Sequence, residues 1–393
     1  MNDASAEGTG LCVPFDCGLV DRLMEAAGLD ALVVNSKHNT RYMLGGHRFF
    51  FFQTMDAIGH SRYLPLVVYL RGAPDRTAYV GSAMEAWDHA LRPFWTPHFR
   101  AASWGTRDAA GLAAEHLKGA VKPGARIGVE YPFLPMDAHA VLAEALPEAA
   151  FADATPVLER LRAIKRPDEL ERLRIASDRI VESMLATIAW AGEGTRKSQI
   201  IDRMREEEVC RGLEFDYCLV TMGSDRNRAR SDQALRPGDI LSIDSGGNFE
   251  GYIGDLCRMA VLGAPDAELQ DLLAEVDAVQ RAVFAGLRAG AVGRDLLDRG
   301  NKVLKAGPNH GCTDLVIHGM GLVSHEVPFL MSNRIYAGTD IDMPLEAGLV
   351  LSVETTMGHP ERGFVKLEDT VAITADCYEM FGDGARGWNI IGS

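Results

Sequence analysis

The chain has 393 residues, of which 47% are hydrophobic, and it carries a formal net charge of −15. This length is typical of two domains of roughly 100–200 residues each, and the apolar fraction supplies a large core. The negative charge argues against nucleic acid or an anionic membrane as a partner, because both repel an acidic protein. No apolar run approaches the ~18 residues that a membrane-spanning helix needs.

The cysteines indicate the compartment. Their number is odd, they are scattered, and none forms a CxxC pair; they are at positions 12, 17, 210, 218, 257, 312 and 377. This pattern is typical of reduced thiols in a reducing environment. The first seven residues are acidic and polar, without the basic and apolar segments of a secretory signal. We therefore expect a cytoplasmic protein.

The first part of the chain, residues 1–157, alternates between strand-like and helical patterns. Strands are expected at 31–35, 64–70, 77–80 and 126–130, and helices at 19–27, 109–117 and 138–146. This alternation predicts an α/β domain. The run from Phe49 to Phe52 has two interpretations: core residues of a strand, or the apolar rim of a substrate pocket.

The second part, residues 158–393, predicts an α+β domain. Pro167 is a favourable first residue for a long helix, because its missing N–H is not needed there. Apolar residues then recur at helical spacing as far as Ile188. Further amphipathic helices are expected at 202–211 and 267–290, with antiparallel hairpins between them.

A pair of aspartates lies in a segment that predicts such a hairpin. Asp244 and Asp255 each follow strand-forming residues, and glycines lie between them. A turn centred near Phe249 and Glu250 would place the two aspartates directly opposite each other, with Cβ atoms roughly 5 Å apart. Two carboxylates that close repel each other unless a cation lies between them. The segment therefore predicts a divalent metal site.

Three further candidate ligands follow in chain order. His318 opens a glycine-rich segment, Glu354 ends an apolar run, and Glu368 follows a strand-like run. A carboxylate at the end of a buried strand is costly unless it is paired. Oxygen donors with one imidazole suit Mn, Co, Fe or Mg better than a structural zinc site, which prefers thiolates. Four carboxylates would balance two divalent ions.

With these ligands in this order, the chain resembles the pita-bread metallopeptidases of peptidase family M24. That group includes methionine aminopeptidase, prolidase and aminopeptidase P, together with the metal-free relative creatinase. The resemblance extends to residues 160–165 and 167–170, where the catalytic domain begins, and to residues 28–34 and 41–46 of the N-terminal domain. It implies a creatinase- or prolidase-like α/β domain over 1–157 and an α+β pita-bread catalytic domain over 158–393.

The resemblance also implies roles for the five ligands. Asp244 would chelate one metal ion, His318 and Glu354 would hold a second, and Asp255 and Glu368 would bridge the two ions. We expect Mn or Co in these places, with Fe, Zn or Mg as alternatives. A bound pair of ions would activate a water molecule and polarise the scissile carbonyl.

Two residues are expected to take part in catalysis itself. Glu354 would pass a proton from the attacking water. His325, seven residues after His318 in the same glycine-rich segment, matches a family histidine that donates a hydrogen bond to the substrate or to the tetrahedral intermediate.

Four positions depart from the family's pattern. They are Thr355–Gly358 in place of Pro-Gly, Lys366 in place of arginine, asparagine and arginine in the loop 220–228 in place of histidine, and Ile317 in place of glycine. A lysine lacks the bidentate geometry of an arginine. We expect a small substrate with a free carboxylate, held by Arg226, Arg228 or Lys366, although loop arginines also commonly face water.

These observations predict a dinuclear metal-dependent hydrolase of amide bonds, most simply a Xaa-Pro dipeptidase or an aminopeptidase-like enzyme. One alternative is a creatinase-like hydrolase, or another hydrolase of non-peptide amides, that acts on a small metabolite. The other is a non-catalytic binding protein that kept the fold. The expected partners are a small peptide or amide and a second copy of the chain in a homodimer.

Overall fold

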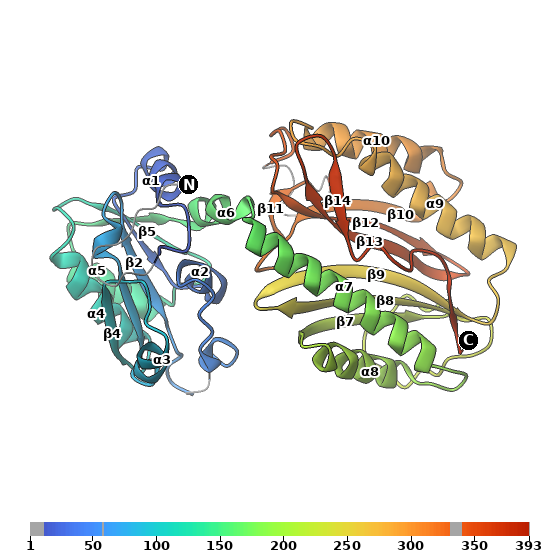
Figure 1. Ribbon diagram of the computed structural model, residues 1–393, viewed down its shortest axis with the longest axis horizontal. Helices are drawn as coiled ribbons and strands as arrows, with labels where there is room; N and C mark the ends of the chain where they lie inside the picture. Colours follow the sequence, from blue (N-terminus) through green and yellow to red (C-terminus); the bar gives the residue numbers. More distant parts are fainter. Residues whose placement is uncertain (1–11, 57–58, 331–339, 393) are drawn as a thin grey trace. The chain divides into compact units, whose positions relative to one another are not determined.

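The computed structural model describes residues 12–56, 59–330 and 340–392, which form two compact units (Figure 1). The first unit ends at Arg162 and the second begins at Ala163. Each unit has its own sheet and its own buried core. Within the described parts of the chain, no helix is both long and apolar enough to cross a membrane.

The first unit is built on a six-stranded mixed sheet in the order β4-β3-β2-β1-β5-β6. β1 pairs antiparallel with β2 and parallel with β5. The strands are β1 (Ala31–Val34), β2 (Leu66–Leu70), β3 (Ala78–Ser82), β4 (His98–Ser103), β5 (Arg126–Val129) and β6 (Ala150–Asp153). The helices are α1 (Cys17–Ala26), α2 (Lys37–Met43), α3 (Glu85–Leu91), α4 (Thr106–Lys118), α5 (Met136–Ala145) and α6 (Thr155–Ala163). The predicted α/β organisation is confirmed.

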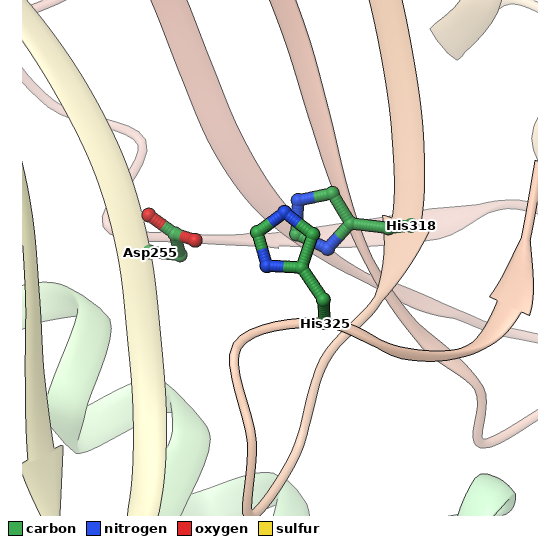
Figure 2. A group of neighbouring side chains, drawn as sticks. All are labelled: Asp255, His318 and His325. Carbon is green, nitrogen blue, oxygen red and sulfur yellow. The ribbon is translucent and has the colours of Figure 1, made fainter. Parts of the chain in front are cut away.

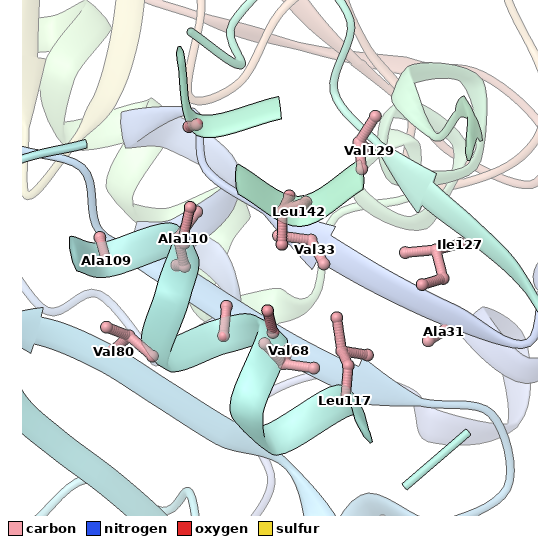
Figure 3. Close-up of a cluster of buried hydrophobic side chains, with 14 of the residues drawn as sticks. Ala31, Val33, Val68, Val80, Ala109, Ala110, Leu117, Ile127, Val129 and Leu142 are labelled. Atoms are coloured by element: carbon pink, nitrogen blue, oxygen red, sulfur yellow. The ribbon is translucent and has the colours of Figure 1, made fainter. Parts of the chain in front are cut away.

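The core of this unit lies between the sheet and two helices (Figure 3). β-branched side chains such as Val33 and Val68 stand on the strands, where their branching packs well against neighbours. α4 presents small residues, including Ala110, together with Leu117, and α5 adds Leu142. All five side chains are fully buried.

The strand expected at Phe49–Phe52 is wrong. Phe50–Phe52 form a 3₁₀ helix, closed by a 2.9 Å hydrogen bond from the N–H of Phe52 to the carbonyl of Phe49. Phe49 and Phe52 are buried together with Tyr63, whereas Phe50 is exposed. This run of four aromatic residues therefore buries two of its side chains and forms a helical turn in place of a strand.

The second unit holds a nine-stranded sheet, counted over the described residues, whose main path is β11-β10-β12-β13-β9-β8-β7. β14 pairs with β13, and β15 pairs with β9. The strands are β7 (Glu214–Met222), β8 (Ile240–Phe249), β9 (Tyr252–Leu262), β10 (Thr313–Gly319), β11 (Glu326–Phe329), β12 (Val350–His359), β13 (Gly363–Ile373), β14 (Tyr378–Phe381) and β15 (Asn389–Ile391).

Four helices of the second unit pack on one face of this sheet: α7 (Pro167–Trp190), α8 (Lys197–Cys210), α9 (Ala267–Phe284) and α10 (Gly293–Ala306). Figure 1 shows α7 and α8 beside β7–β9 and α9 and α10 beside β10–β13. The strands send alternate side chains, such as Ile243, Leu256, Ile317 and Val353, into these helices. The intervening side chains face the opposite side, because strand side chains alternate. That opposite face carries the polar residues described below.

The β8–β9 hairpin is confirmed, but its register differs from the one predicted. Glu250 and Gly251 form the turn with φ values of 50° and 94°. Asp244 therefore lies opposite Cys257, and Asp255 lies opposite Gly246. The expectation that the two aspartates oppose each other directly is wrong, because the turn is centred one residue later. They are diagonal neighbours on the same face, which still brings their side chains together.

A buried carboxyl group on α8 gives the second unit a pH-dependent stability. Glu208 accepts a 2.7 Å hydrogen bond from the hydroxyl of Ser245, while its other oxygen, Oε2, has no partner among the described residues. Burial raises the pKa of Glu208 to about 8. An unfolded glutamate titrates near 4.3, so the folded chain binds the proton more tightly. The stability that this proton supplies is present at low pH and is lost as the pH rises toward 8.

We expect the free energy of unfolding of the natural protein to fall relative to that of Glu208→Gln between pH 5 and pH 8. The expected relative change is roughly 2–4 kcal/mol, the size of a pKa shift of this kind. Urea unfolding of both proteins at several pH values measures it. Stability curves that run parallel over this range would show that Glu208 titrates normally.

Candidate metal centre

Three carboxylates lie in one row across the sheet of the second unit. Asp244 on β8 is the register partner of Cys257 on β9, Cys257 pairs with Glu368 on β13, and Glu368 pairs with Glu354 on β12. Directly opposed like charges destabilise a sheet unless they are compensated. All three carboxylate side chains are buried or nearly so. The strand register therefore concentrates negative charge on the face opposite the helices.

Two more expected ligands flank this row. Asp255 lies on the same strand as Cys257, two residues away, and His318 on β10 pairs with Ser352 on β12. Each offers one donor atom within 4.8 Å of a donor atom of the other. Asp244, Asp255 and Glu368 form a second group that meets the same limit. The structure thus brings together all five side chains that the sequence singled out.

Three potential ligand atoms in this cluster are buried without a hydrogen bond to any described residue, and one of them, Oε2 of Glu368, has the Lys366 ammonium 2.7 Å away. Oδ1 of Asp255 and Nε2 of His318 form no hydrogen bond with any described residue, although both side chains are almost fully buried. Nδ1 of His318 lies 3.2 Å from the carbonyl of Gly319, which fixes the ring and leaves Nε2 facing the cluster. Oε1 of Glu368 lies 3.8 Å from Nε2, beyond hydrogen-bond range. Unpartnered buried donors of this kind fit a metal ion.

His325 lies directly beside His318, as Figure 2 shows. Their rings are stacked with centroids 3.8 Å apart and an angle of 10° between the planes. The lone pair of an imidazole nitrogen lies in the ring plane, so two parallel stacked rings cannot direct lone pairs at one ion. This arrangement favours the donor role expected of His325 over a ligand role.

The loop that returns His325 to His318 depends on close backbone approaches. A Cβ atom at Gly319 would lie 2.2 Å from the carbonyl oxygen of Val327, and one at Gly321 would lie 2.2 Å from Oε1 of Glu326. Glu326 is in turn held by Lys165, whose Nζ lies 2.6 Å from Oε1 in a fully buried ion pair. Sequence reasoning missed this Lys165 contact, since the two residues are far apart in the chain.

Lys366 has an unexpected position. Its side chain is buried in the cluster, and its Nζ lies 2.6 Å from Oδ2 of Asp244, 2.5 Å from Oε2 of Glu354 and 2.7 Å from Oε2 of Glu368. Lys366 was expected at the substrate, but its ammonium group contacts three of the expected metal ligands. Its i, i+2 spacing from Glu368 on β13 explains the shared face.

The charges of the cluster shift one another's pKa values. Burial, reinforced by Glu368 and Asp244, raises the pKa of Asp255 well above its usual range. Burial also raises the pKa of Asp244 to about 6, although Lys366 opposes the shift. For Glu368 burial acts in the same direction, but Lys366 and His318 outweigh it and lower the pKa. A divalent ion that binds the ionised carboxylates would oppose these upward shifts.

Tyr217 on β7 is a residue of the site that sequence reasoning missed. Burial, reinforced by Asp255 and the other carboxylates of the cluster, raises the pKa of the Tyr217 hydroxyl well above its usual range. A Cβ atom at Gly246 would lie 2.3 Å from the ring of Tyr217, so glycine is required opposite Asp255. The sequence signal was weak: an aromatic residue in a strand next to the aspartate strand.

The loop arginines are not equivalent. Arg228 places its guanidinium 4.6 Å from the ring centre of Phe364, with Nη1 3.5 Å from Oδ2 of Asp244. Arg226 donates a 3.1 Å hydrogen bond to the carbonyl of Gly358. Arg230 pairs with Asp202 on α8. Of the two arginines predicted to bind substrate, Arg228 is the one with a contact in the carboxylate cluster.

Comparison with known families adds an independent observation. The model of metallopeptidase family M24 matches residues 171–375, and the model of the creatinase/prolidase N-terminal domain matches residues 19–164. The chain belongs to metallopeptidase family M24. It has a creatinase-type N-terminal domain and a pita-bread catalytic domain, which confirms the predicted family and fold.

Two curated relatives illustrate the similarity. The chain is 29% identical over 229 residues to the probable dipeptidase PepE of Mycobacterium tuberculosis, a match that covers 57% of this chain and 59% of the relative. It is 26% identical over 233 residues to the Xaa-Pro dipeptidase of Pyrococcus furiosus, covering 57% and 64%. The matches thus span less than two thirds of these relatives' own lengths.

Solved structures share the fold over nearly the whole chain. Dipeptidase PepE from Mycobacterium ulcerans superposes with a TM-score of 0.77 at 24% identity, covering 95% of this chain and 96% of that one. The prolidase from Thermococcus sibiricus gives a TM-score of 0.80 at 16% identity, covering 95% and 98%. At these identities the superpositions establish the fold alone.

Proposed function

We propose that this M24 member hydrolyses the peptide bond of dipeptides or similarly short peptides, most simply as a Xaa-Pro dipeptidase or an aminopeptidase-like enzyme. The observation that carries the proposal is the pair of buried, unpartnered donors on Asp255 and His318, with His325 stacked beside them. Dipeptidase and Xaa-Pro dipeptidase are also the names of its curated relatives.

The residues proposed to form the metal site are Asp244, Asp255, His318, Glu354 and Glu368. A bound divalent ion, with Mn or Co as our first expectation, supplies Lewis acidity that activates water and polarises a carbonyl group. The number of ions bears on Lys366 and is taken up in the next subsection. Cytoplasmic location and a homodimer remain predictions.

The chain's own residues would position the substrate and move a proton. A carboxylate oxygen of Glu354, at the end of the row, would accept the proton of the attacking water and hold it for the leaving amine. A ring nitrogen of His325 would donate to the oxygen that becomes negative in the transition state. Donors aimed at such an oxygen typically contribute a few kcal/mol.

Arg228 is the proposed anchor for a free substrate carboxylate, because guanidinium groups bind carboxylates by paired hydrogen bonds. We expect Arg228→Gln to raise KM for a dipeptide roughly 10- to 100-fold, the scale of a lost charge-assisted hydrogen bond. The uncharged C-terminal amide of the same dipeptide should be much less affected. Arg226→Gln, which removes an arginine that donates to the carbonyl of Gly358, serves as the matched control.

Steady-state kinetics of the two substrates with both variants measure this prediction. Equal weakening of the acid and the amide, or no change in either, would show that Arg228 is structural. A larger effect of Arg226→Gln than of Arg228→Gln would mean that the wrong arginine was chosen.

The proposed function itself is tested by assaying the purified protein against Xaa-Pro dipeptides, other dipeptides, and small cyclic or guanidino amides, with Mn, with Co and with a chelator. Metal-dependent cleavage of dipeptides supports the proposal. Cleavage of guanidino or cyclic amides alone would favour the creatinase-like alternative. Binding without turnover of any of these compounds would favour the non-catalytic alternative.

A further inference from the structure

Lys366 is a cation already in place among the expected metal ligands. An ammonium group has three N–H donors, and Nζ of Lys366 lies within 2.7 Å of three carboxylate oxygens, one each from β8, β12 and β13. The ammonium donates a hydrogen bond to Oδ2 of Asp244 and forms close ion pairs with Glu354 and Glu368. The side chain is only 2% exposed, so the ammonium has no solvent to move into within the folded unit.

Because of this contact, the two carboxylate oxygens of Glu368 have different neighbours. Oε2 faces the ammonium, whereas Oε1 accepts a 2.7 Å hydrogen bond from Ser352 and lies 3.8 Å from Nε2 of His318. A carboxylate that bridges two metal ions needs one oxygen for each ion. Glu368 here has one oxygen on the Lys366 side and one oxygen on the His318 side.

The His318 side of the cluster differs from the Lys366 side in the hydrogen bonding of its buried atoms. Oδ1 of Asp255 and Nε2 of His318 are buried without a hydrogen bond to any described residue. Asp255 offers a ligand atom within 4.8 Å of one of His318 in one group of side chains and of one of Glu368 in another, and Nε2 of His318 lies 3.8 Å from Oε1 of Glu368. Two carboxylates and one imidazole form a ligand set that a single divalent ion accepts.

We infer that the ammonium group of Lys366 takes the place of one of the two expected metal ions, so that the chain holds one divalent ion, between Asp255, His318 and Glu368. The inference rests on the proposed function for its metal-dependent site, and it concerns how many ions that site holds. Four carboxylates, the ammonium and one divalent ion leave a net charge of −1, beside which lies the guanidinium of Arg228.

The same arrangement changes the task of Asp244 and Glu354. Each has one oxygen on the ammonium, so Lys366 holds them apart from the ion and neutralises their charge. Glu354 is then not a metal ligand, and the proton-transfer role proposed above is the one that remains for it.

Metal counting tests the inference directly. The natural protein, Lys366→Met and the control Lys305→Met would be dialysed against excess Mn²⁺, freed of unbound metal and analysed by inductively coupled plasma mass spectrometry. Lys305 is an exposed residue of α10, so its replacement removes a charge without touching the cluster. We expect one ion per chain in the natural protein and in Lys305→Met, and two in Lys366→Met.

A second measurement covers the case in which Lys366→Met does not fold. Crystals of the natural protein soaked in Mn²⁺ should give one anomalous-scattering peak, near Asp255 and His318, and none among Asp244, Glu354 and Nζ of Lys366. Two peaks, or two ions per natural chain, would overturn the inference. A folded Lys366→Met that still binds one ion would overturn it as well.

Parallel assays separate this inference from the proposed function. A natural protein that binds two ions and cleaves dipeptides would refute the single-ion inference and leave the function intact. One that binds a single ion at the stated place and cleaves none of the peptides would support the inference and refute the dipeptidase proposal.

Discussion

Replacement of Asp255 by alanine should abolish stable metal binding and reduce kcat/KM on the order of 10³-fold. The loss reflects several kcal/mol of transition-state stabilisation that a correctly held divalent ion supplies. Asp255 is the proposed ligand expected to matter most, because its Oδ1 is buried without a hydrogen bond to any described residue. Metal content and steady-state kinetics measured on the same preparation check the prediction.

The stability of the same variant provides an independent readout. Metal that binds only the folded chain stabilises it by about 2.7 kcal/mol at a concentration 100 times Kd, so the natural protein should gain thermal stability when Mn²⁺ is added. Asp255→Ala should gain much less. It should also lose little stability in chelator, since it removes a carboxyl group that repels its neighbours and whose pKa is raised by burial. Asp271→Ala, on an exposed position of α9, should behave like the natural protein in every assay.

Normal metal content in Asp255→Ala would contradict the assignment of Asp255 as a ligand. Full activity of a metal-free Asp255→Ala would be a more serious failure, because it would remove metal from the reaction and favour the creatinase-like alternative.

The five candidate ligands could be singled out from the sequence for a physical reason. Ligands such as Asp244 and Glu354 stand out locally, because a carboxylate in or after a buried strand needs a partner. Their order and neighbours then identified the family. Helical periodicity likewise predicted α7 from Pro167 onward, since a long amphipathic stripe is a strong local signal.

The features that could not be predicted from the sequence depend on strand register and on contacts between strands that are distant in the chain. A turn centred one residue later than expected changed which residue faces Asp255. The contacts of Lys366 require β8, β12 and β13 to be aligned at once, which no local pattern encodes. Arginine is the family's residue at this position, so the lysine was noticed, but where its shorter side chain ends could be found only from the strand pairing.

The predicted extent of the helices was wrong for a related reason. The helix expected at 267–290 ends at Phe284, just before Gly286, whose Cβ would lie 2.9 Å from a methyl carbon of Leu296. This close approach of α9 to α10 is set by tertiary packing, which the local sequence pattern does not reveal. α10 itself was missed because its buried stripe consists of few apolar residues interrupted by glycines.

Replacement of His325 by alanine should lower kcat about 10²- to 10³-fold and leave metal content unchanged. This is the scale of losing one hydrogen-bond donor to a developing oxyanion. The rings of His325 and His318 are stacked in parallel, 3.8 Å apart. In this arrangement His325 cannot direct a lone pair at an ion bound by His318, so we expect it to act as a hydrogen-bond donor to the substrate. His318→Ala should instead lose metal and activity together, because Nε2 of His318 is buried and unpartnered.

Ser324→Ala gives this experiment a graded comparison. The hydroxyl of Ser324 lies 3.1 Å from Nδ1 of His325, so its removal should loosen the ring without removing the donor. We expect a smaller fall in kcat, with KM and metal content near normal. His325→Ala that loses as much metal as His318→Ala would identify His325 as a ligand, and the two rings would then have to rotate out of their stack when the ion binds. Normal kcat in His325→Ala would remove it from the reaction altogether and leave the stabilisation of the oxyanion to the metal ion.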